Sequence, residues 1–278
     1  MITTQVTVNW KSSVLKVLLF CLCCALILII CAPLTKDLPK PWSDILLGIV
    51  AATGVFGLTV VFSRWEKLTL NDIGVRPRKQ TIPLFAGGLA IGLFLAITHA
   101  LLVITFGKVT WTYAPQTSWV SILLTLFLYL ILALREELAF RGYALRSLAY
   151  AIGPWKAQAM IALIFALEHL AGGYTLKQAF LGAGIGAILF GIAALKSKGI
   201  ALPVGLHAAW NFGQWATGLK NEPGIWQTLV EKGYEPEYEN LNFAFYLVVM
   251  ILAIGGFYLY KKEGFWGKGS SVGSGNTP

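Results

Sequence analysis

Three short runs in the second half of the chain combine side chains that can move protons and stabilise negative charge. The first is REELAFR at 135–141, the second ends in Glu168 and His169, and the third contains His207 and Asn211. Carboxylates and imidazoles act as general acids and bases, and imidazole and carboxamide N–H groups stabilise oxyanions. Such a set can activate water beside a polarised carbonyl group, so it predicts hydrolysis of a peptide bond. No Ser or Cys accompanies the histidines in these runs, which disfavours an acyl-enzyme route.

Helical spacing gives these residues distinct expected roles. Glu137 and Arg141 are four residues apart with the acid first, so Arg141 can hold Glu137 ionised while Glu136 projects elsewhere and stays free. His207 and Asn211 are also four apart, so both can present donors to one point. The sequence therefore predicts one structural carboxylate and one available carboxylate.

The elements that must position these runs are eight apolar segments, each long enough to cross a bilayer. Of the 278 residues, 56% are hydrophobic and 13% are charged, whereas ordinary soluble domains carry about 25% charged residues. This composition excludes a disordered chain, a disulfide scaffold and a water-soluble enzyme. The segments are 14–34, 43–62, 82–106, 119–147, 154–170, 176–195, 199–218 and 241–260. We predict an all-α, polytopic membrane protein of about eight transmembrane helices with an intramembrane polar cavity.

Positive charge is concentrated on one side of this predicted bundle. Eight spans put both termini on one side, which holds fifteen of the 22 lysines and arginines, against six on the other side and Arg135 within a span. The positive-inside rule then predicts cytoplasmic termini in a multi-pass protein of the cell membrane. Because topology explains the net charge of +9, nucleic acid is not an expected partner. We expect residues 1–266 to form a single membrane-embedded domain and the Gly/Ser-rich residues 267–278 to form a disordered cytoplasmic tail.

Other polar and small residues of the spans are predicted to serve packing. His99 has no polar partner nearby in the sequence, which favours packing or a helix–helix hydrogen bond over catalysis. The four cysteines all fall in the first span, where small apolar packing residues are favoured over metal ligands or disulfides. The pairs Gly88/Gly92 and Gly182/Gly186 are four residues apart in apolar spans, a spacing typical of close helix–helix contacts.

Taken in order, the three runs resemble the CPBP family of intramembrane proteases. This family includes the type II CAAX prenyl endopeptidases and bacterial proteins tied to bacteriocin processing and self-immunity. Its pattern is EExxxR, then FxxxH, then HxxxN or HxxxD. The matching residues are Glu136, Glu137 and Arg141, then Phe165 and His169, then His207 and Asn211. The resemblance covers roughly 119–218, the expected motif core.

The resemblance implies an all-helical membrane protease whose site opens toward the cytosol. By analogy with the family, Glu136 is the general base and His169 helps to bind the attacking water. His207 and Asn211 form the oxyanion hole.

Three further residues have supporting roles in the same analogy. The ion pair of Glu137 and Arg141 completes the site, and Phe165 shapes the pocket without reacting.

The sequence leaves metal dependence open. His169, His207 and Glu136 could supply a site for zinc or another divalent metal, but the H-E-x-x-H motif is absent and a carboxylate with a positioned water suffices. We favour a glutamate-dependent mechanism with no cofactor, and keep the metalloprotease mechanism as the alternative.

The function expected from these observations is that of an intramembrane endopeptidase. Its partners would be the lipid bilayer and a peptide or protein substrate, with membrane-anchored or lipidated substrates included. The alternative is a non-catalytic membrane immunity factor, scaffold or transporter that retains the family helices.

Overall fold

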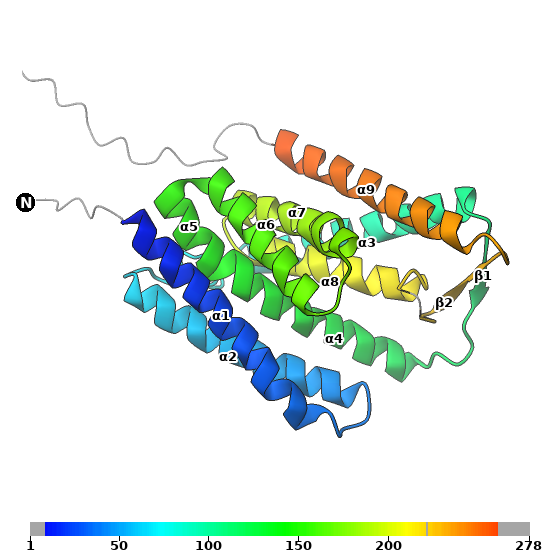
Figure 1. Ribbon diagram of the computed structural model, residues 1–278, viewed down its shortest axis with the longest axis horizontal. Helices are drawn as coiled ribbons and strands as arrows, with labels where there is room; N and C mark the ends of the chain where they lie inside the picture. The colour runs from blue at the N-terminus through cyan, green and yellow to red at the C-terminus, as the bar shows by residue number, and fades with distance from the viewer. Residues whose placement is uncertain (1–8, 221, 261–278) are drawn as a thin grey trace, which may run out of the picture.

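The structure is a computed structural model that describes residues 9–220 and 222–260 as a bundle of long helices (Figure 1). The predicted tail at 267–278 and the domain boundary at 266 lie outside the described residues. The helical elements are α1 (Trp10–Thr35), α2 (Trp42–Trp65), α3 (Thr81–Phe106), α4 (Trp119–Glu137), η1 (Leu138–Ala144), α5 (Leu145–Ile152), α6 (Pro154–Ala171), η2 (Lys177–Ala183), α7 (Gly184–Ser197), α8 (Ala201–Ala216) and α9 (Glu235–Leu259). The two strands are β1 (Val109–Tyr113) and β2 (Trp226–Val230).

These elements confirm the predicted all-α, multi-pass class. Within the described residues, α4, η1 and α5 join into one segment, and η2 joins α7, so the helices follow the eight predicted spans. Six segments are long and apolar enough to cross a membrane, namely α1, α2, α3, the joined α4–α5 segment, the joined η2–α7 segment and α9. The helices α6 and α8 do not meet these criteria. Of these two, α8 packs against α3, α4 and α7, so most of its side chains are buried by protein.

Both described ends of the chain lie at one end of the bundle, and the strands lie at the other (Figure 1). The strands pair antiparallel, with Val109 opposite Val230 and Tyr113 opposite Trp226. They are absent from the sequence prediction. Both strands are rich in β-branched and aromatic residues, but each is five residues long and its partner is far away in the chain, so no local pattern reveals the pairing.

The contact between α3 and α8 depends on glycine. A methyl group on Gly88 would overlap the carbonyl oxygen of Leu202, and one on Gly205 would overlap the carbonyl oxygen of Phe85. Gly92 approaches the α8 backbone in the same way. The close contact predicted for Gly88 and Gly92 is therefore confirmed, and it fixes α8, which carries His207 and Asn211, against α3.

At Gly182 and Gly186 the neighbouring helix approaches through a side chain and not through its backbone. A side-chain carbon on Gly182 would meet nothing within 4 Å, and one on Gly186 would make only an ordinary contact with the Tyr246 hydroxyl at 3.6 Å. Both glycines line the cavity, and α9 contacts this stretch through Tyr246, whose hydroxyl donates to the carbonyl oxygen of Gly182 at 2.6 Å. Spacing alone does not distinguish a glycine that admits another helix from one that leaves open space.

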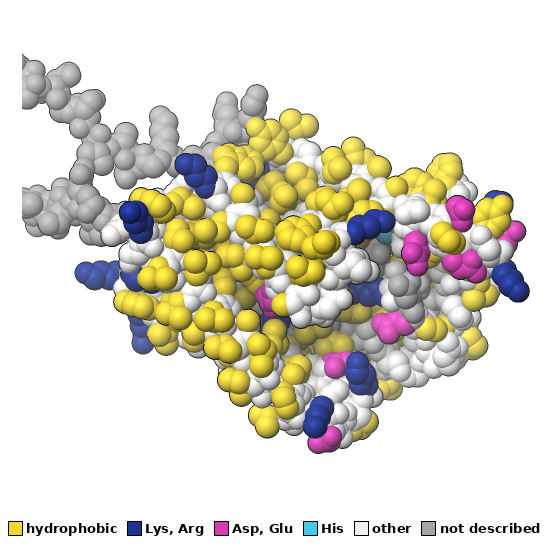
Figure 2. All heavy atoms as spheres, viewed as in Figure 1, with side chains coloured by type: hydrophobic (Ala, Val, Ile, Leu, Met, Phe, Trp, Pro, Cys, Tyr) yellow, Lys and Arg dark blue, Asp and Glu magenta, His cyan; other side chains and the backbone are white. Residues whose placement is uncertain are grey.

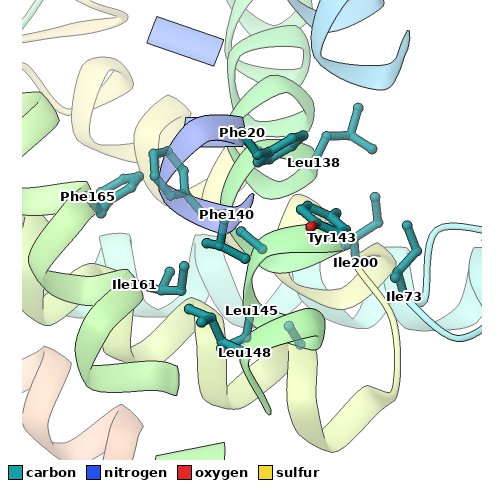
Figure 3. Close-up of a cluster of buried hydrophobic side chains, with 14 of the residues drawn as sticks. Phe20, Ile73, Leu138, Phe140, Tyr143, Leu145, Leu148, Ile161, Phe165 and Ile200 are labelled. Atoms are coloured by element: carbon teal, nitrogen blue, oxygen red, sulfur yellow. The ribbon is translucent and has the colours of Figure 1, made fainter. Parts of the chain in front are cut away.

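A cluster of buried apolar side chains holds the bundle together on the side of the termini (Figure 3). Phe20 of α1 packs edge-on against Tyr143 of η1, with ring centroids 4.9 Å apart. The π-helical turn η1 is wholly buried, and the backbone leaves helical geometry at Gly142 (ψ −110°). This buried turn follows directly after Glu136 and Glu137, so core packing fixes the direction of the two carboxylates.

Candidate active site

The carboxylate of Glu136 is held by an arginine that precedes it in the chain. Arg135 Nη2 lies 2.6 Å from Glu136 Oε1, and Arg135 Nη1 lies 3.2 Å from Glu168 Oε1 on α6. The expectation that Glu136 is free of an ion pair is therefore wrong. Adjacent residues on a helix do not normally face each other, but the long arginine side chain reaches both acids. Glu136 Oε2 stays available on the side of His207.

The second carboxylate, Glu137, forms the predicted ion pair with Arg141. Their Oε1 and Nη1 atoms are 3.3 Å apart, and both side chains have no exposed surface. Arg141 Nη2 donates to the carbonyl oxygen of Ala187 at 3.2 Å. The guanidinium also lies 4.7 Å from the ring centroid of Phe165. Glu137 and Arg141 thus form a buried charge pair that joins η1 to α7.

His207 lies between the two carboxylates. Its Nδ1 is 2.9 Å from Glu137 Oε1, and its Nε2 is 3.7 Å from Glu136 Oε2. A carboxylate only accepts hydrogen bonds, so Nδ1 carries a proton. The ring stacks on Phe190, with centroids 4.3 Å apart and planes at 15°. His207 is thus fixed in position and orientation, with Nε2 toward Glu136.

The tautomer of His169 is set by its own helix. Its Nδ1 is 2.9 Å from the carbonyl oxygen of Phe165, so Nδ1 must donate and Nε2 is left as an acceptor in the neutral ring. The Phe165 ring lies 4.4 Å away, and the Tyr174 ring approaches edge-on at 5.1 Å. Phe165 therefore contacts both His169 and the guanidinium of Arg141.

Asn211 follows His207 by one turn on α8, and its amide is held from outside the helix. Lys220, in the loop after α8, donates from Nζ to Asn211 Oδ1 at 3.1 Å. The Nδ2 group of Asn211 is thereby left as the end that can donate to a ligand.

These side chains line one cavity of about 640 Å³. Glu136 from α4, His169 from α6, and His207 and Asn211 from α8 all contribute to its wall. The structure thus brings the four candidate catalytic residues together from three helices.

The cavity opens at the end of the bundle that carries the strands. Its rim includes Lys220 from the loop after α8 and Tyr174 from the loop between α6 and η2. Lys177, the first residue of η2, and Glu239, near the start of α9, complete it. Figure 2 shows a hollow there with charged side chains around it, whereas apolar side chains cover most of the same face toward the termini. The mouth and the described termini therefore lie at opposite ends, so cytoplasmic termini and a site open to the cytosol, both expected from the sequence, cannot hold together.

The candidate metal ligands His169, His207 and Glu136 all lie on the wall of this cavity. Among the described residues, no group of three or more His, Cys, Asp or Glu side chains has the geometry to hold a metal ion. Glu136 Oε1 is engaged by Arg135, while the Nδ1 hydrogen bonds of His169 and His207 leave Nε2 of each ring as the nitrogen that could bind a metal.

Other residues weighed from the sequence serve structure, as predicted. His99 Nε2 lies 2.9 Å from the carbonyl oxygen of Asn242 on α9, and Nδ1 lies 3.0 Å from the amide nitrogen of Gln214 on α8. His99 is therefore a buried link between α3, α8 and α9. The four cysteines are free and lie on α1.

Sequence reasoning missed three residues of this site. Arg135 gave a usable signal, because a cation within a span needs a partner. Phe190 and Lys220 gave none, since an aromatic residue in an apolar helix and a lysine in a loop are ordinary. Their roles depend on contacts with residues distant in the chain.

Comparison with known families agrees with this geometry. Residues 117–213 match the family model described as Type II CAAX prenyl endopeptidase Rce1-like. The matched range contains all three motif runs and nearly coincides with the expected core at 119–218, so the resemblance identified from the sequence is confirmed. The match supports a protease or hydrolase activity in general. A search of curated proteins found no match to this chain.

Proposed function

We propose that this chain, with its Rce1-like domain at 117–213, is an intramembrane endopeptidase that hydrolyses a peptide bond with water activated by Glu136. The observation that carries the proposal is the convergence of Glu136, His169, His207 and Asn211 on one cavity from three helices. Isolated titratable residues in a membrane protein are costly. Their convergence on a cavity supports a shared chemical role.

In the proposed mechanism, Glu136 and His169 position the attacking water. Glu136 Oε1 is bound to Arg135, which leaves Oε2 as the oxygen that accepts a proton from water. Nε2 of His169 is the free acceptor of its ring and takes the second hydrogen bond of that water. The water oxygen then attacks the carbonyl carbon as its proton moves to Glu136.

His207 and Asn211 stabilise the oxyanion formed by this attack. Asn211 donates from Nδ2, since Oδ1 already accepts from Lys220. His207 donates from Nε2 in the form of the ring that carries both protons, with its Nδ1 proton directed at Glu137. The proton held by Glu136 then passes to the leaving nitrogen, the C–N bond breaks, and a carboxylic acid and an amine are released. The acid loses its remaining proton to water.

The decisive test of this mechanism is Glu136→Gln in the full-length protein, reconstituted in lipid and assayed with membrane-anchored peptides. We expect kcat to fall by about a thousandfold or more, because general-base catalysis contributes typically 10²–10⁴-fold and water activation depends on it here. Glu239→Gln is the matched control, since it removes a carboxylate at the rim of the same cavity. Full activity of the Glu136→Gln variant would show that Glu136 is not the general base.

The substrate proposed for this site is a peptide or protein segment that reaches the cavity from the membrane, with lipidated and membrane-anchored chains included. The aromatic side chains of Tyr129, Trp210 and Phe243 in the cavity wall support a partly apolar ligand. Comparison of cleavage of one peptide with and without a lipid anchor tests this preference.

We also propose that both termini face the cytoplasm of a cell membrane, as the charge distribution indicates. The cavity mouth would then face the opposite side, since it lies at the other end of the bundle. The test is labelling of single cysteines by an impermeant maleimide in intact cells, in a variant without the native cysteines. We expect labelling at Lys232→Cys and not at Lys79→Cys, since both positions are exposed but lie at opposite ends. The reverse labelling pattern would show that the cavity mouth faces the cytosol and that the termini do not.

One observation favours the non-catalytic alternative. Arg135, Glu136 and Glu168 form a paired, mostly buried charge network, which also suits a structural or transport role. Unchanged biological function in an inactive Glu136→Gln variant would favour that alternative.

A further inference from the structure

Lys220, which follows α8, donates a hydrogen bond to a candidate catalytic side chain at the cavity mouth. Its Nζ lies 3.1 Å from Asn211 Oδ1. The ammonium also lies 4.5 Å from the ring centroid of Tyr129 on α4. A single loop residue thus connects α4 to the amide of α8 at the cavity mouth.

The chemistry of this contact fixes the direction of the amide. A carboxamide has one accepting and one donating end, and a rotation of 180° exchanges them at little steric cost. A lysine ammonium has three donors and no acceptor. Only the carbonyl end of Asn211 can therefore face Lys220, and the donating end must face away from it.

We infer that Lys220 is a positioning residue that directs the Nδ2 group of Asn211 toward the oxyanion. This inference rests on the proposed peptidase function. Lys220 acts through Asn211 and does not itself contact the reacting atoms.

The loop that carries Lys220 is anchored well enough for this role. Gly218 adopts a left-handed conformation (φ +72°), and Leu219 N donates to the carbonyl oxygen of Gln214 at 3.0 Å. The carbonyl oxygen of Thr217 accepts from Trp111 Nε1 at 2.8 Å and from Thr228 Oγ1 at 3.0 Å. Both strands therefore hold the loop, and a side chain at Gly218 would collide with β2. This anchoring gives β1 and β2 a function in the site.

The protonation of Lys220 supplies an independent readout. Lys220 is exposed as a whole residue, but the protein packed around its ammonium at the cavity mouth lowers the pKa of Lys220 to about 8. A neutral amine can accept as well as donate, so it no longer selects one amide orientation. Tyr129 contacts the Lys220 ammonium, and the charges of Glu136 and Glu222 act on it. The other charged or titratable groups of the surrounding elements that line the same cavity include His169, Tyr174, Lys177, His207 and Glu239.

The experiment compares Lys220→Met, Lys220→Arg, Asn211→Ala and the Lys220→Met/Asn211→Ala double variant in the full-length protein in lipid. Loss of a hydrogen bond to a charged group is equivalent to about tenfold in rate, so we expect Lys220→Met to lower kcat by about tenfold, with KM within about twofold. Lys220→Arg restores kcat, since arginine also only donates. In the Asn211→Ala background, Lys220→Met should have no further effect.

The matched control is Lys108→Met. Lys108 lies at the same end of the bundle, with its ammonium 3.6 Å from the ring centroid of Tyr234, and is absent from the cavity lining. We expect wild-type kcat and KM for this variant. As pH rises through about 8, kcat of the wild type should fall while that of Lys220→Arg is maintained, since every other facing group is the same in both proteins.

Three results would overturn the inference in an active enzyme. The first is an unchanged kcat in Lys220→Met. The second is a further fall in kcat when Lys220→Met is added to Asn211→Ala. The third is an equal fall in kcat above about pH 8 in the wild type and in Lys220→Arg. Failure of the peptidase proposal is a different result, because the wild type would then cleave no more than Glu136→Gln.

Discussion

The buried pair of Glu137 and Arg141 gives the sharpest prediction about stability. In Arg141→Met, the Glu137 carboxylate loses its cationic partner in a site without exposed surface, where its remaining partner is His207 Nδ1 at 2.9 Å. Removal of one partner of a buried ion pair costs about 3–5 kcal/mol, because the other charge is left without compensation. The variant also loses the hydrogen bond to Ala187 and the contact with the Phe165 ring. We therefore expect the free energy of unfolding to fall by an amount in the upper part of that range.

The double variant Arg141→Met/Glu137→Gln separates charge from packing. Replacement of a whole buried pair by neutral groups is often close to neutral in stability, so most of the lost stability should return. Proteolysis should stay low, because glutamine accepts from His207 Nδ1 but does not stabilise a charged ring. Stability would then return without activity.

The measurement is reversible unfolding in mixed micelles with increasing sodium dodecyl sulfate, followed by tryptophan fluorescence. Lys40→Met is the control, since Lys40 and Asp44 are also four residues apart, at 3.5 Å, but have 82% and 39% exposed side chains. Exposed pairs of this kind contribute about 0–1 kcal/mol. The reasoning would be refuted if Arg141→Met were no more destabilised than Lys40→Met, or if the double variant were as unstable as Arg141→Met.

Three further predictions concern the site and its support. Proteolysis should persist after treatment with a metal chelator and dialysis, measured by cleavage of the anchored peptide; loss of activity that a divalent metal restores would contradict the metal-free mechanism. Phe190→Leu should lower kcat several-fold with little change in stability, because the flat ring that stacks on His207 is lost, and equal kinetics in the variant would count against that role. Gly205→Val should prevent folding or lower the midpoint of thermal unfolding by many degrees, since any side chain there overlaps the α3 backbone at Phe85, whereas Gly255→Val on α9, where a side-chain carbon meets nothing within 4 Å, should be tolerated.

Local sequence was sufficient for the helices and for the candidate residues that the structure brings to one cavity. Length and apolarity identify six segments of the described chain that can cross a membrane as helices, in which the backbone groups pair within the segment and not with lipid. The four-residue spacing of Glu137 and Arg141 predicts their ion pair, since such residues share one face of a helix. These properties are set by residues close together in the chain, and short-range patterns report them directly.

The partners of the reactive residues were decided only by the tertiary structure. Arg135 reaches Glu168 on another helix, Lys220 directs the amide of Asn211 from a loop, and Phe190 supports His207 from α7. The strand pair that anchors the loop of Lys220 joins segments far apart in the sequence. The direction of the cavity mouth likewise follows from the packing of helix ends. Contacts of this kind depend on how whole helices are placed against one another, and no spacing within a single segment contains that information.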